Sequence, residues 1–360
     1  MKKLRTGVLG ATGLAGQQVV AALQGHPWFS VTALAASDRS AGKAYGEALR
    51  GSGGASRWFA DGSADPSLEA LVMGGAADLV QADVDLVFSA VDRETALEWE
   101  PKLAVRVPVI STASAFRDEP DVPLLLPGIN NAHAGVIPTQ RRQRGWRGFI
   151  APIPNCTTAG LAISLKPLQD RFGLRLVAMT SMQAVSGAGR AEGVLALDVI
   201  DNVVPFIPGE EEKVVRETRK ILGCWGDRFE PAPLALTCTC TRVNVQDGHT
   251  EAVFVATERP ADAEAAFEAM AAFTPEGLAG LPSAPERLLQ VVRDPFRPQP
   301  RRDRDAGGGM TVTVGRMRTD EALGGVKYVV LSHNTKLGAG KGAVLLAEWL
   351  TREGFVGGPA

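Results

Sequence analysis

The sequence predicts a two-domain α/β protein with a doubly wound, Rossmann-type parallel sheet first and an α+β domain second. Over the first 150 residues, apolar strand-like runs alternate with helical runs. A glycine-rich turn follows the first of these runs. The chain has 360 residues, and a chain of this length usually folds around two or more separate hydrophobic cores. We therefore expect domains at 1–153 and 154–334, and a closing helix at 335–360 that returns to the first domain.

The composition excludes several functional classes. The chain is 45% hydrophobic, which is ordinary for a globular protein. Its formal net charge is −2, so no strong electrostatic field favours binding to nucleic acid or to a membrane surface. The sequence contains no run of about 18 apolar residues, which is the length that a membrane-spanning helix needs. Four cysteines are too few for a disulfide scaffold, and Cys238-Thr239-Cys240 lacks zinc-ligand spacing. We expect a cytoplasmic protein with small-molecule ligands and no metal, nucleic-acid or membrane partner.

A glycine turn between a strand run at 4–9 and a helical run at 17–23 predicts a dinucleotide site. The turn reads Gly10-Ala11-Thr12-Gly13-Leu14-Ala15-Gly16. Gly10 and Gly13 permit a tight turn and close backbone approach, and Gly16 permits the helix to pack on the strand. The pyrophosphate is expected at the helix N-terminus. A plain strand-to-helix turn is the alternative.

The end of the second strand, at 31–36, bears on the choice of cofactor. Asp38 suits a ribose 2′-hydroxyl and would indicate NAD. Arg39, with Ser37 and Ser40, instead offers donors to a 2′-phosphate and favours NADP. The alternative is a solvated loop containing Arg39 and Lys43.

Two further strands are predicted at 84–90 and 107–110. Ser89 and Ala90 end the first of these strands, and Arg117 follows the second. Ligands bind beyond the carboxyl ends of such strands, so these residues are expected on the cofactor side. The arginine-rich run at 140–147 includes one aromatic residue and no stacking array. It is predicted to be a solvated excursion.

Cys156 is the candidate nucleophile. Apolar residues recur after it with helical spacing, at Leu161, Leu165, Leu168 and Phe172. Asn155 or Thr157 could cap this helix. A cysteine at a helix N-terminus feels the positive end of the dipole, which favours the reactive thiolate. The alternative is a small buried residue.

Polar residues that could form a ligand site follow in the second half. Gln183 precedes a glycine-rich turn that can present amide groups to a ligand. Glu210 and Lys213 share a helix face and could bind an amine and an anion, although first-turn acids also complement the dipole. His249 follows the strand that carries Arg242 and could be an acid/base beside an anion site, but a lone histidine is usually structural.

Together these stretches resemble aspartate-β-semialdehyde dehydrogenases of the archaeal and fungal branch, over nearly the whole chain. The motifs occur in the family's order: GATGLAGQ from residue 10, ASDRSAGKAYGEA from 36, STASAFR from 111, PNCTTAG from 154, SMQAVSGAGR from 181, GEEEK from 209, TRVNVQDGHTE from 241, RPQPRRDRDAGGGM from 297 and LSHNTKLGAGKGA from 331. Asn244 stands where the family commonly has proline, which bears on strand geometry more than on chemistry.

The resemblance implies NADPH-dependent reductive dephosphorylation of L-aspartyl 4-phosphate to L-aspartate 4-semialdehyde, towards lysine, threonine, methionine and isoleucine. Three residues are implied in the chemistry: Cys156 as thioester-forming nucleophile, His249 as acid/base and Gln183 as orienting residue. Five are implied in substrate binding: Glu210 for the α-ammonium, Arg242 for the carboxylate, Arg117 and Lys213 for the phosphate, and Asn155. In addition to the glycine turn, Ser37, Arg39, Ser40, Ser89 and Ala90, the resemblance implies cofactor contacts at Ser186, Gly187 and Asn334.

The same resemblance implies that residues 1–153 bind NADP and that residues 154–334 form the catalytic and dimerisation domain of a homodimer or tetramer. Two other functions stay open. One is a related acyl-phosphate or acyl-thioester reductase, such as malonyl-CoA reductase. The other is a non-catalytic, NADP-binding regulatory protein.

Overall fold

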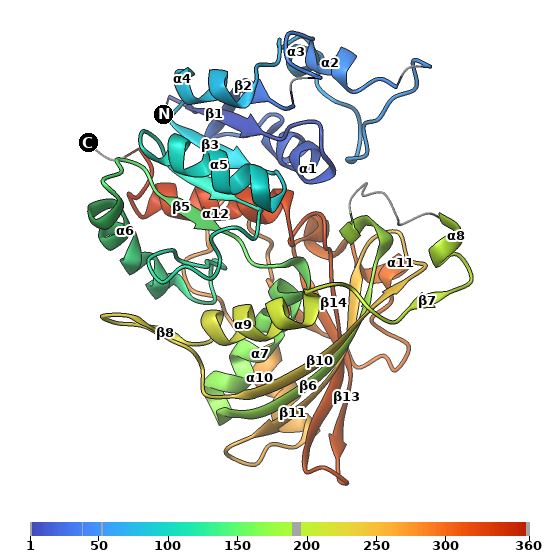
Figure 1. The fold of residues 1–360 in the computed structure, drawn as a ribbon. Coiled ribbons are helices and arrows are strands. Elements are labelled where there is room, and N and C mark those ends of the chain that lie inside the picture. The colour runs from blue at the N-terminus through green and yellow to red at the C-terminus, as the bar shows by residue number, and fades with distance from the viewer. Residues whose placement is uncertain (1, 38, 52, 189–195, 358–360) are drawn as a thin grey trace.

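The computed structural model describes residues 2–37, 39–51, 53–188 and 196–357, and it contains two main sheets (Figure 1). The first sheet has five parallel strands in the order β2-β1-β3-β4-β5. Its strands are β1 (Leu4–Leu9), β2 (Phe29–Ala35), β3 (Leu86–Ser89), β4 (Val109–Ser111) and β5 (Ile150–Pro152). The chain winds outward from β1 in both directions, which confirms the predicted doubly wound sheet.

The helices of this half connect the parallel strands. Two are long, α1 (Leu14–Leu23) and α5 (Arg93–Ala104). The others are α2 (Tyr45–Ala48), α3 (Pro66–Glu69), α4 (Ala76–Gln81), the 3-10 helix η1 (Asn131–Val136) and α6 (Ile137–Arg144). The glycine turn therefore lies at the carboxyl end of β1, beside that of β3, where the strand order reverses and ligands bind in such sheets.

The second sheet is mixed and has seven strands in the order β12-β13-β14-β11-β6-β10-β7. These are β6 (Leu174–Gln183), β7 (Val203–Val204), β10 (Ala235–Val243), β11 (His249–Thr257), β12 (Leu289–Val291), β13 (Val312–Asp320) and β14 (Gly325–Ser332). A separate two-stranded pair consists of β8 (Cys224–Trp225) and β9 (Phe229–Glu230). The β6–β10 pair is parallel and the β6–β11 pair is antiparallel.

One face of this sheet is covered by α7 (Cys156–Phe172), α9 (Glu210–Ile221) and α10 (Ala263–Ala271). The inward side chains of β6 and β11, such as Val177, Met179 and Val253, are buried against α7. The remaining short helices are η2 (Val185–Ala188), α8 (Ala196–Val199), α11 (Pro300–Asp303) and η3 (Ala306–Gly309). The core thus fixes α7, whose first residue is Cys156, against the sheet.

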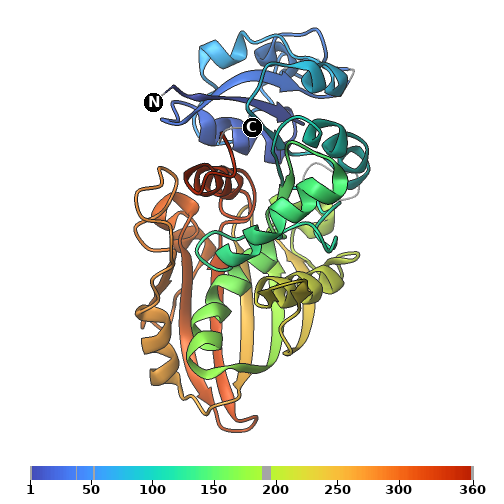
Figure 2. The same ribbon diagram turned by 90° about the vertical axis from the view of Figure 1, so that its left-hand side faces the viewer.

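The last helix, α12 (Gly340–Arg352), returns to the first sheet as predicted (Figure 2). A Cβ at Gly340 would lie 2.4 Å from the carbonyl carbon of Gln18, so α12 and α1 approach too closely for a side chain there. His26 Nε2 lies 2.8 Å from Glu348 Oε1, and Glu348 also accepts from the Ser283 amide. α12 therefore joins the two halves.

Residues 140–147 contradict the expectation of a solvated excursion. Most of this run belongs to α6, where Arg144 pairs with Asp121 and Arg141 donates to the Phe355 carbonyl at 3.0 Å. These partners lie far away in the sequence, so local composition could not indicate them. The domain boundaries at 153 and 334 stay predictions. Within the described ranges, no helix has the length and apolar character needed to cross a bilayer.

Candidate active site

Cys156 is the first residue of α7, and Asn155 caps the helix as expected. The Asn155 Oδ1 atom accepts from the amides of Thr157 at 2.9 Å and Thr158 at 3.2 Å. These amides would otherwise lack partners at the helix start. The cap fixes the backbone on both sides of the cysteine.

Cys156 and His249 form a close pair. The distance from Cys156 Sγ to His249 Nε2 is 3.2 Å, and His249 is fully buried at the start of β11. The amide of Ala184 donates to His249 Nδ1 at 3.0 Å. Because an amide nitrogen always carries its proton, Nδ1 must be the acceptor, and neutral His249 must carry its proton on Nε2. The ring therefore presents an N–H group to the sulfur.

The resting pair is uncharged. Burial raises the pKa of Cys156 from 9.0 to about 12, the Glu210 carboxylate adds to this, and the positive charges of Arg117 and Arg242 oppose it. Burial also lowers the pKa of His249 to about 3. The expected thiolate is therefore not favoured in the resting site, because burial and Glu210 outweigh the helix dipole.

The inner face of the second sheet brings Gln183, Arg242 and His249 together. Gln183 on β6 pairs in register with Arg242 on β10, and His249 begins the neighbouring β11. Arg242 Nη1 donates to the Ala184 carbonyl at 2.9 Å, and Gln183 Nε2 donates to Glu210 Oε1 at 3.2 Å. Residues from β6, β10 and β11 thus meet at one end of the sheet, as the predicted site requires.

Glu210 begins α9 and faces the cap of the cysteine helix. Its Oε1 accepts from Asn155 Nδ2 at 2.9 Å, and Glu210 is 6% exposed. Lys213 Nζ lies 3.8 Å from Glu210 Oε2 and is partly exposed. The predicted acid and base therefore lie together beside Cys156, with the acid buried and the base reaching towards solvent.

Arg117 is buried and paired with an acid that the sequence did not single out. Arg117 Nη1 lies 2.9 Å from Glu217 Oε1, and Nη2 donates to the Thr112 carbonyl at 2.7 Å. Glu217 follows Glu210 by seven residues, which places both on one face of a helix. That spacing was the only signal in the sequence that could have identified it.

Three backbone segments lie close to Cys156 and His249, which together are called the dyad below. A Cβ at Gly187 would lie 2.9 Å from both His249 Cε1 and Arg242 Nη1. A Cβ at Gly338, which sequence reasoning missed, would lie 2.6 Å from Cys156 Cβ. Asn334 Oδ1 accepts from the Gly248 amide, and its Nδ2 donates to Ser186 Oγ, both at 2.8 Å. The predicted cofactor residues Ser186, Gly187 and Asn334 therefore lie next to the dyad.

The glycine turn forms a backbone cradle. Gly10 has φ +83°, and a Cβ there would lie 2.5 Å from the Ala90 carbonyl oxygen, at the end of β3. A Cβ at Gly16 would lie 2.1 Å from the Gly10 carbonyl oxygen. Only glycine fits either position. Leu14 begins α1, so its first-turn amides face the turn, and this donor set suits a pyrophosphate.

A basic cavity of about 320 Å³ lies beside this turn. It contains the predicted residues Thr12, Ser37, Arg39 and Ser40. Sequence reasoning missed Arg50 and Arg57, and it left Lys43 as part of a solvated loop; these three cations also line the cavity, as does Glu47. Asp38 lies outside the described residues. Several cations and hydroxyls in one cavity suit a phosphate group.

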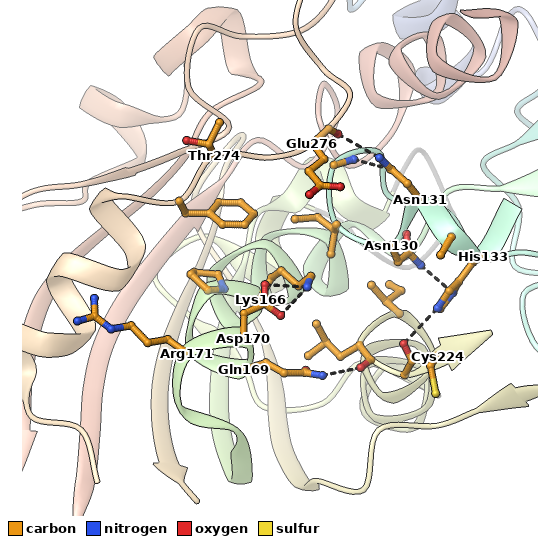
Figure 3. Close-up of a pocket in the computed structure, with 18 of the residues that line it drawn as sticks. Asn130, Asn131, His133, Lys166, Gln169, Asp170, Arg171, Cys224, Thr274 and Glu276 are labelled. Atoms are coloured by element: carbon orange, nitrogen blue, oxygen red, sulfur yellow. Dashed lines mark hydrogen bonds and ion pairs between the residues drawn. The ribbon is translucent and has the colours of Figure 1, made fainter. Parts of the chain in front are cut away.

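Two further cavities differ in their relation to the dyad. One of about 470 Å³ lies between the two halves, lined by Leu14 and Ser186 among others. The larger of the two, about 730 Å³, lies beside the second half of α7 (Figure 3). Lys166 on its wall is ten residues after Cys156, about 15 Å along a helix. Cavity size alone would therefore have pointed away from the reactive cysteine.

Comparisons with known proteins agree with this geometry. The family described as "Semialdehyde dehydrogenase, NAD binding domain" matches residues 5–136, and "Semialdehyde dehydrogenase, dimerisation domain" matches residues 165–337. Aspartate-semialdehyde dehydrogenase of Archaeoglobus fulgidus is 48% identical, covering 97% of this chain and 98% of the relative. The Candida albicans enzyme is 39% identical, covering 99% and 100%. A crystal structure of the latter with NADP has a TM-score of 0.87 and 37% identity, covering 99% of this chain and all of that one. The chain therefore belongs to the aspartate-semialdehyde dehydrogenase family and is an oxidoreductase.

Proposed function

We propose that the chain converts L-aspartyl 4-phosphate and NADPH into L-aspartate 4-semialdehyde, NADP⁺ and phosphate, reversibly, in the route to lysine, threonine, methionine and isoleucine. The observation that carries the proposal is the 3.2 Å contact between Cys156 Sγ and His249 Nε2, with Glu210, Gln183 and Arg242 around it. A nucleophile, a hydrogen-bond donor and charges for an amino acid then occupy one site.

The proposed chemistry centres on Cys156. Its thiolate attacks the acyl carbon, a tetrahedral intermediate forms, and phosphate leaves to give a thioester. The Nε2–H group of neutral His249 can donate a hydrogen bond to the thiolate and to the departing phosphate while it keeps its proton, and the phosphate takes up a proton from solvent. NADPH, when bound, supplies the hydride that reduces the thioester. Release of the aldehyde regenerates the Cys156 thiolate, which again accepts a hydrogen bond from the Nε2–H group of His249.

Charge complementarity supports the assignment of the substrate groups. The Glu210 carboxylate is placed to receive the α-ammonium, and the Arg242 guanidinium to bind the α-carboxylate. Arg117 and Lys213 are assigned to the phosphate. Gln183, which donates to Glu210, orients the substrate beside Cys156. Asn155 contributes through its contact with Glu210.

The residues that would hold the cofactor fit NADP. The backbone of residues 10–16, with Ser89 and Ala90, suits the pyrophosphate side. Ser186, Gly187 and Asn334 lie beside the dyad and would hold the nicotinamide end. The basic cavity around Arg39 suits the 2′-phosphate, which NAD lacks. A cytoplasmic location follows from the reducing conditions that a free nucleophilic cysteine needs.

The uncovered face of the second sheet is the proposed homodimer surface. Outward residues of β6, β10 and β11 are uncharged and several are small, for example Thr180, Thr239 and Ala252, all exposed. A flat surface of this kind suits a symmetric contact with a second copy. Thr239→Arg should reduce the mass measured by light scattering to that of one chain. A wild type that already has that mass would contradict the proposal, and four chains would indicate a pair of such dimers.

The deciding experiment supplies NADP⁺, phosphate and aspartate semialdehyde and follows NADPH by absorbance. We expect NADPH formation by the wild type and none by Cys156→Ala, which removes one sulfur atom and should keep its fold. The matched control is Cys224→Ala, because Cys224 is an exposed thiol. A wild type that formed no NADPH, whether it reduced malonyl-CoA instead or only bound NADP, would contradict the proposal.

A further inference from the structure

Glu217 is a buried acid that joins two parts of the active site. It lies on α9, is 2% exposed, and uses each carboxylate oxygen separately. Oε1 is 2.9 Å from Arg117 Nη1, and Oε2 accepts from the Asn155 amide at 2.6 Å. A buried carboxylate is costly unless its oxygens are paired, and bonds of these lengths to charged groups are strong. One side chain thus contacts a proposed phosphate ligand and the residue before the nucleophile.

Helix α9 also fixes the backbone around Arg117. Lys220 Nζ donates to the carbonyl oxygens of Arg117, Glu119 and Val122 at 2.8 to 2.9 Å. The other end of the guanidinium is held by the Thr112 carbonyl. Arg117 comes from the loop after β4, so the first half of the chain provides this cation and the second half sets its direction.

The Arg117 guanidinium keeps a donor for an incoming anion. Its Nε atom is buried and has no hydrogen-bond partner among the described residues. An unpaired buried N–H group is costly, and a phosphate oxygen would satisfy it. Glu217 holds Nη1 and thereby leaves Nε without a competing acceptor.

The same carboxylate fixes the start of the catalytic helix. Asn155 donates its amide to Glu217 and its side-chain Nδ2 to Glu210, while Oδ1 caps α7. The position of Cys156 relative to Arg117 therefore depends on Glu217. Reacting groups need such fixed separations, because small displacements of a catalytic group have large effects on rate.

We infer that Glu217 is a positioning residue, which aims Arg117 at the phosphate and sets its distance from Cys156. This inference rests on the proposed role of Arg117. Glu217→Gln has nearly the same shape but offers one acceptor and one donor, so either Arg117 or Asn155 must face a donor. We expect the KM for phosphate in the oxidative direction to rise about tenfold, the scale of one charged hydrogen bond, and kcat to fall. The KM for aspartate semialdehyde, assigned to Glu210 and Arg242, should change little.

The matched control is Glu212→Gln, which removes the same charge from an exposed position on the same helix and should change neither KM. A double-mutant cycle tests the route of the effect. If Glu217 acts through Arg117, then Glu217→Gln should add little to the phosphate KM of Arg117→Ala. Additive effects would overturn the inference. A lower melting temperature with both KM values unchanged would indicate a purely structural role and would also overturn it.

The two assignments can fail separately. An Arg117→Ala enzyme with a normal phosphate KM would remove Arg117 from the phosphate site, and this inference with it. A raised KM in Arg117→Ala but a normal one in Glu217→Gln would overturn only the role of Glu217. If Glu217→Gln does not fold, Glu217→Asp serves instead, since it keeps both acceptors but withdraws them by one methylene. An unchanged phosphate KM in folded Glu217→Asp would overturn the inference.

Discussion

Replacing Glu210 by glutamine should activate Cys156 in the free enzyme. Three donors bond to Glu210, namely Asn155 Nδ2, Gln183 Nε2 and the Thr157 hydroxyl, and all three bond to Oε1. A glutamine Oε1 can accept the same bonds. The substitution therefore removes a charge and keeps these three bonds, and it loses the ion pair between Glu210 Oε2 and Lys213 Nζ, which are 3.8 Å apart.

The size of the effect follows from the causes of the raised thiol pKa. Burial contributes most and stays in the variant, whereas the Glu210 charge contributes next and is lost. A like charge nearby shifts a pKa by about one unit or more. We therefore expect the thiol pKa to fall by about one unit in Glu210→Gln. The alkylation rate at pH 7.5 should rise only about threefold, because thiolates of lower pKa are weaker nucleophiles.

The assay is the pH dependence of Cys156 alkylation by iodoacetamide, measured by peptide mass spectrometry so that Cys224 and Cys238 do not contribute. Cys156→Ala gives the background, and Glu212→Gln is the charge-matched control. An alkylation midpoint in Glu210→Gln equal to that of the wild type would refute the reasoning. Turnover should nevertheless fall, because the proposed site for the α-ammonium is lost.

Three further predictions concern the cofactor, packing and pH. Arg57→Ala and Arg39→Ala should each weaken binding of 2′,5′-ADP about tenfold in calorimetry and leave 5′-AMP unchanged, since each removes a charged donor; equal losses for both ligands would count against the 2′-phosphate site. Gly160→Ala would place a Cβ 2.6 Å from Ser332 Oγ and should lower the free energy of unfolding by about 1–3 kcal/mol in urea, whereas Gly53→Ala, in open space, should not. Burial raises the pKa of Glu100 from 4.5 to about 7, so the folded state keeps a proton that the unfolded state loses; Glu100 should therefore lower stability by about 3 kcal/mol between pH 4.5 and 7, and Glu100→Gln should remove this part of the slope while buried Glu251, whose pKa is also raised, keeps its own part. A slope unchanged from that of the wild type would exclude Glu100 as a source.

Local patterns in the sequence predicted much of the fold. The apolar run at 4–9 is β1, with the same bounds, and the glycine turn follows it because strand, turn and helix signals are contiguous. A helix beginning near Cys156 was also predicted from neighbouring residues, and Asn155, one of the two predicted cap candidates, is its cap. Such features depend on interactions within one turn or one strand, so the neighbouring residues are sufficient to predict them.

The partners of the site residues could not be predicted in the same way. Glu217 and Arg117 are 100 residues apart, and Arg57 reaches the basic cavity from a loop with no periodicity. The thiol pKa was predicted wrongly because the helix dipole is local, whereas burial and the Glu210 charge depend on tertiary packing. Desolvation of a fully enclosed group usually exceeds the effect of a helix terminus.

The proton on His249 shows most clearly what tertiary structure adds. The sequence identifies this histidine as a candidate. The Ala184 amide, at the end of another strand, determines which ring nitrogen carries the proton. Since Nε2 carries it, resting His249 is a donor to sulfur and cannot remove the thiol proton while the Ala184 bond persists. The cysteine must therefore be activated by a change in its electrostatic surroundings. An ammonium group arriving at Glu210 would provide that change, because it neutralises the charge that raises the thiol pKa. On this argument the substrate helps to form the thiolate that attacks it, and His249 is ready as a hydrogen-bond donor from the first step.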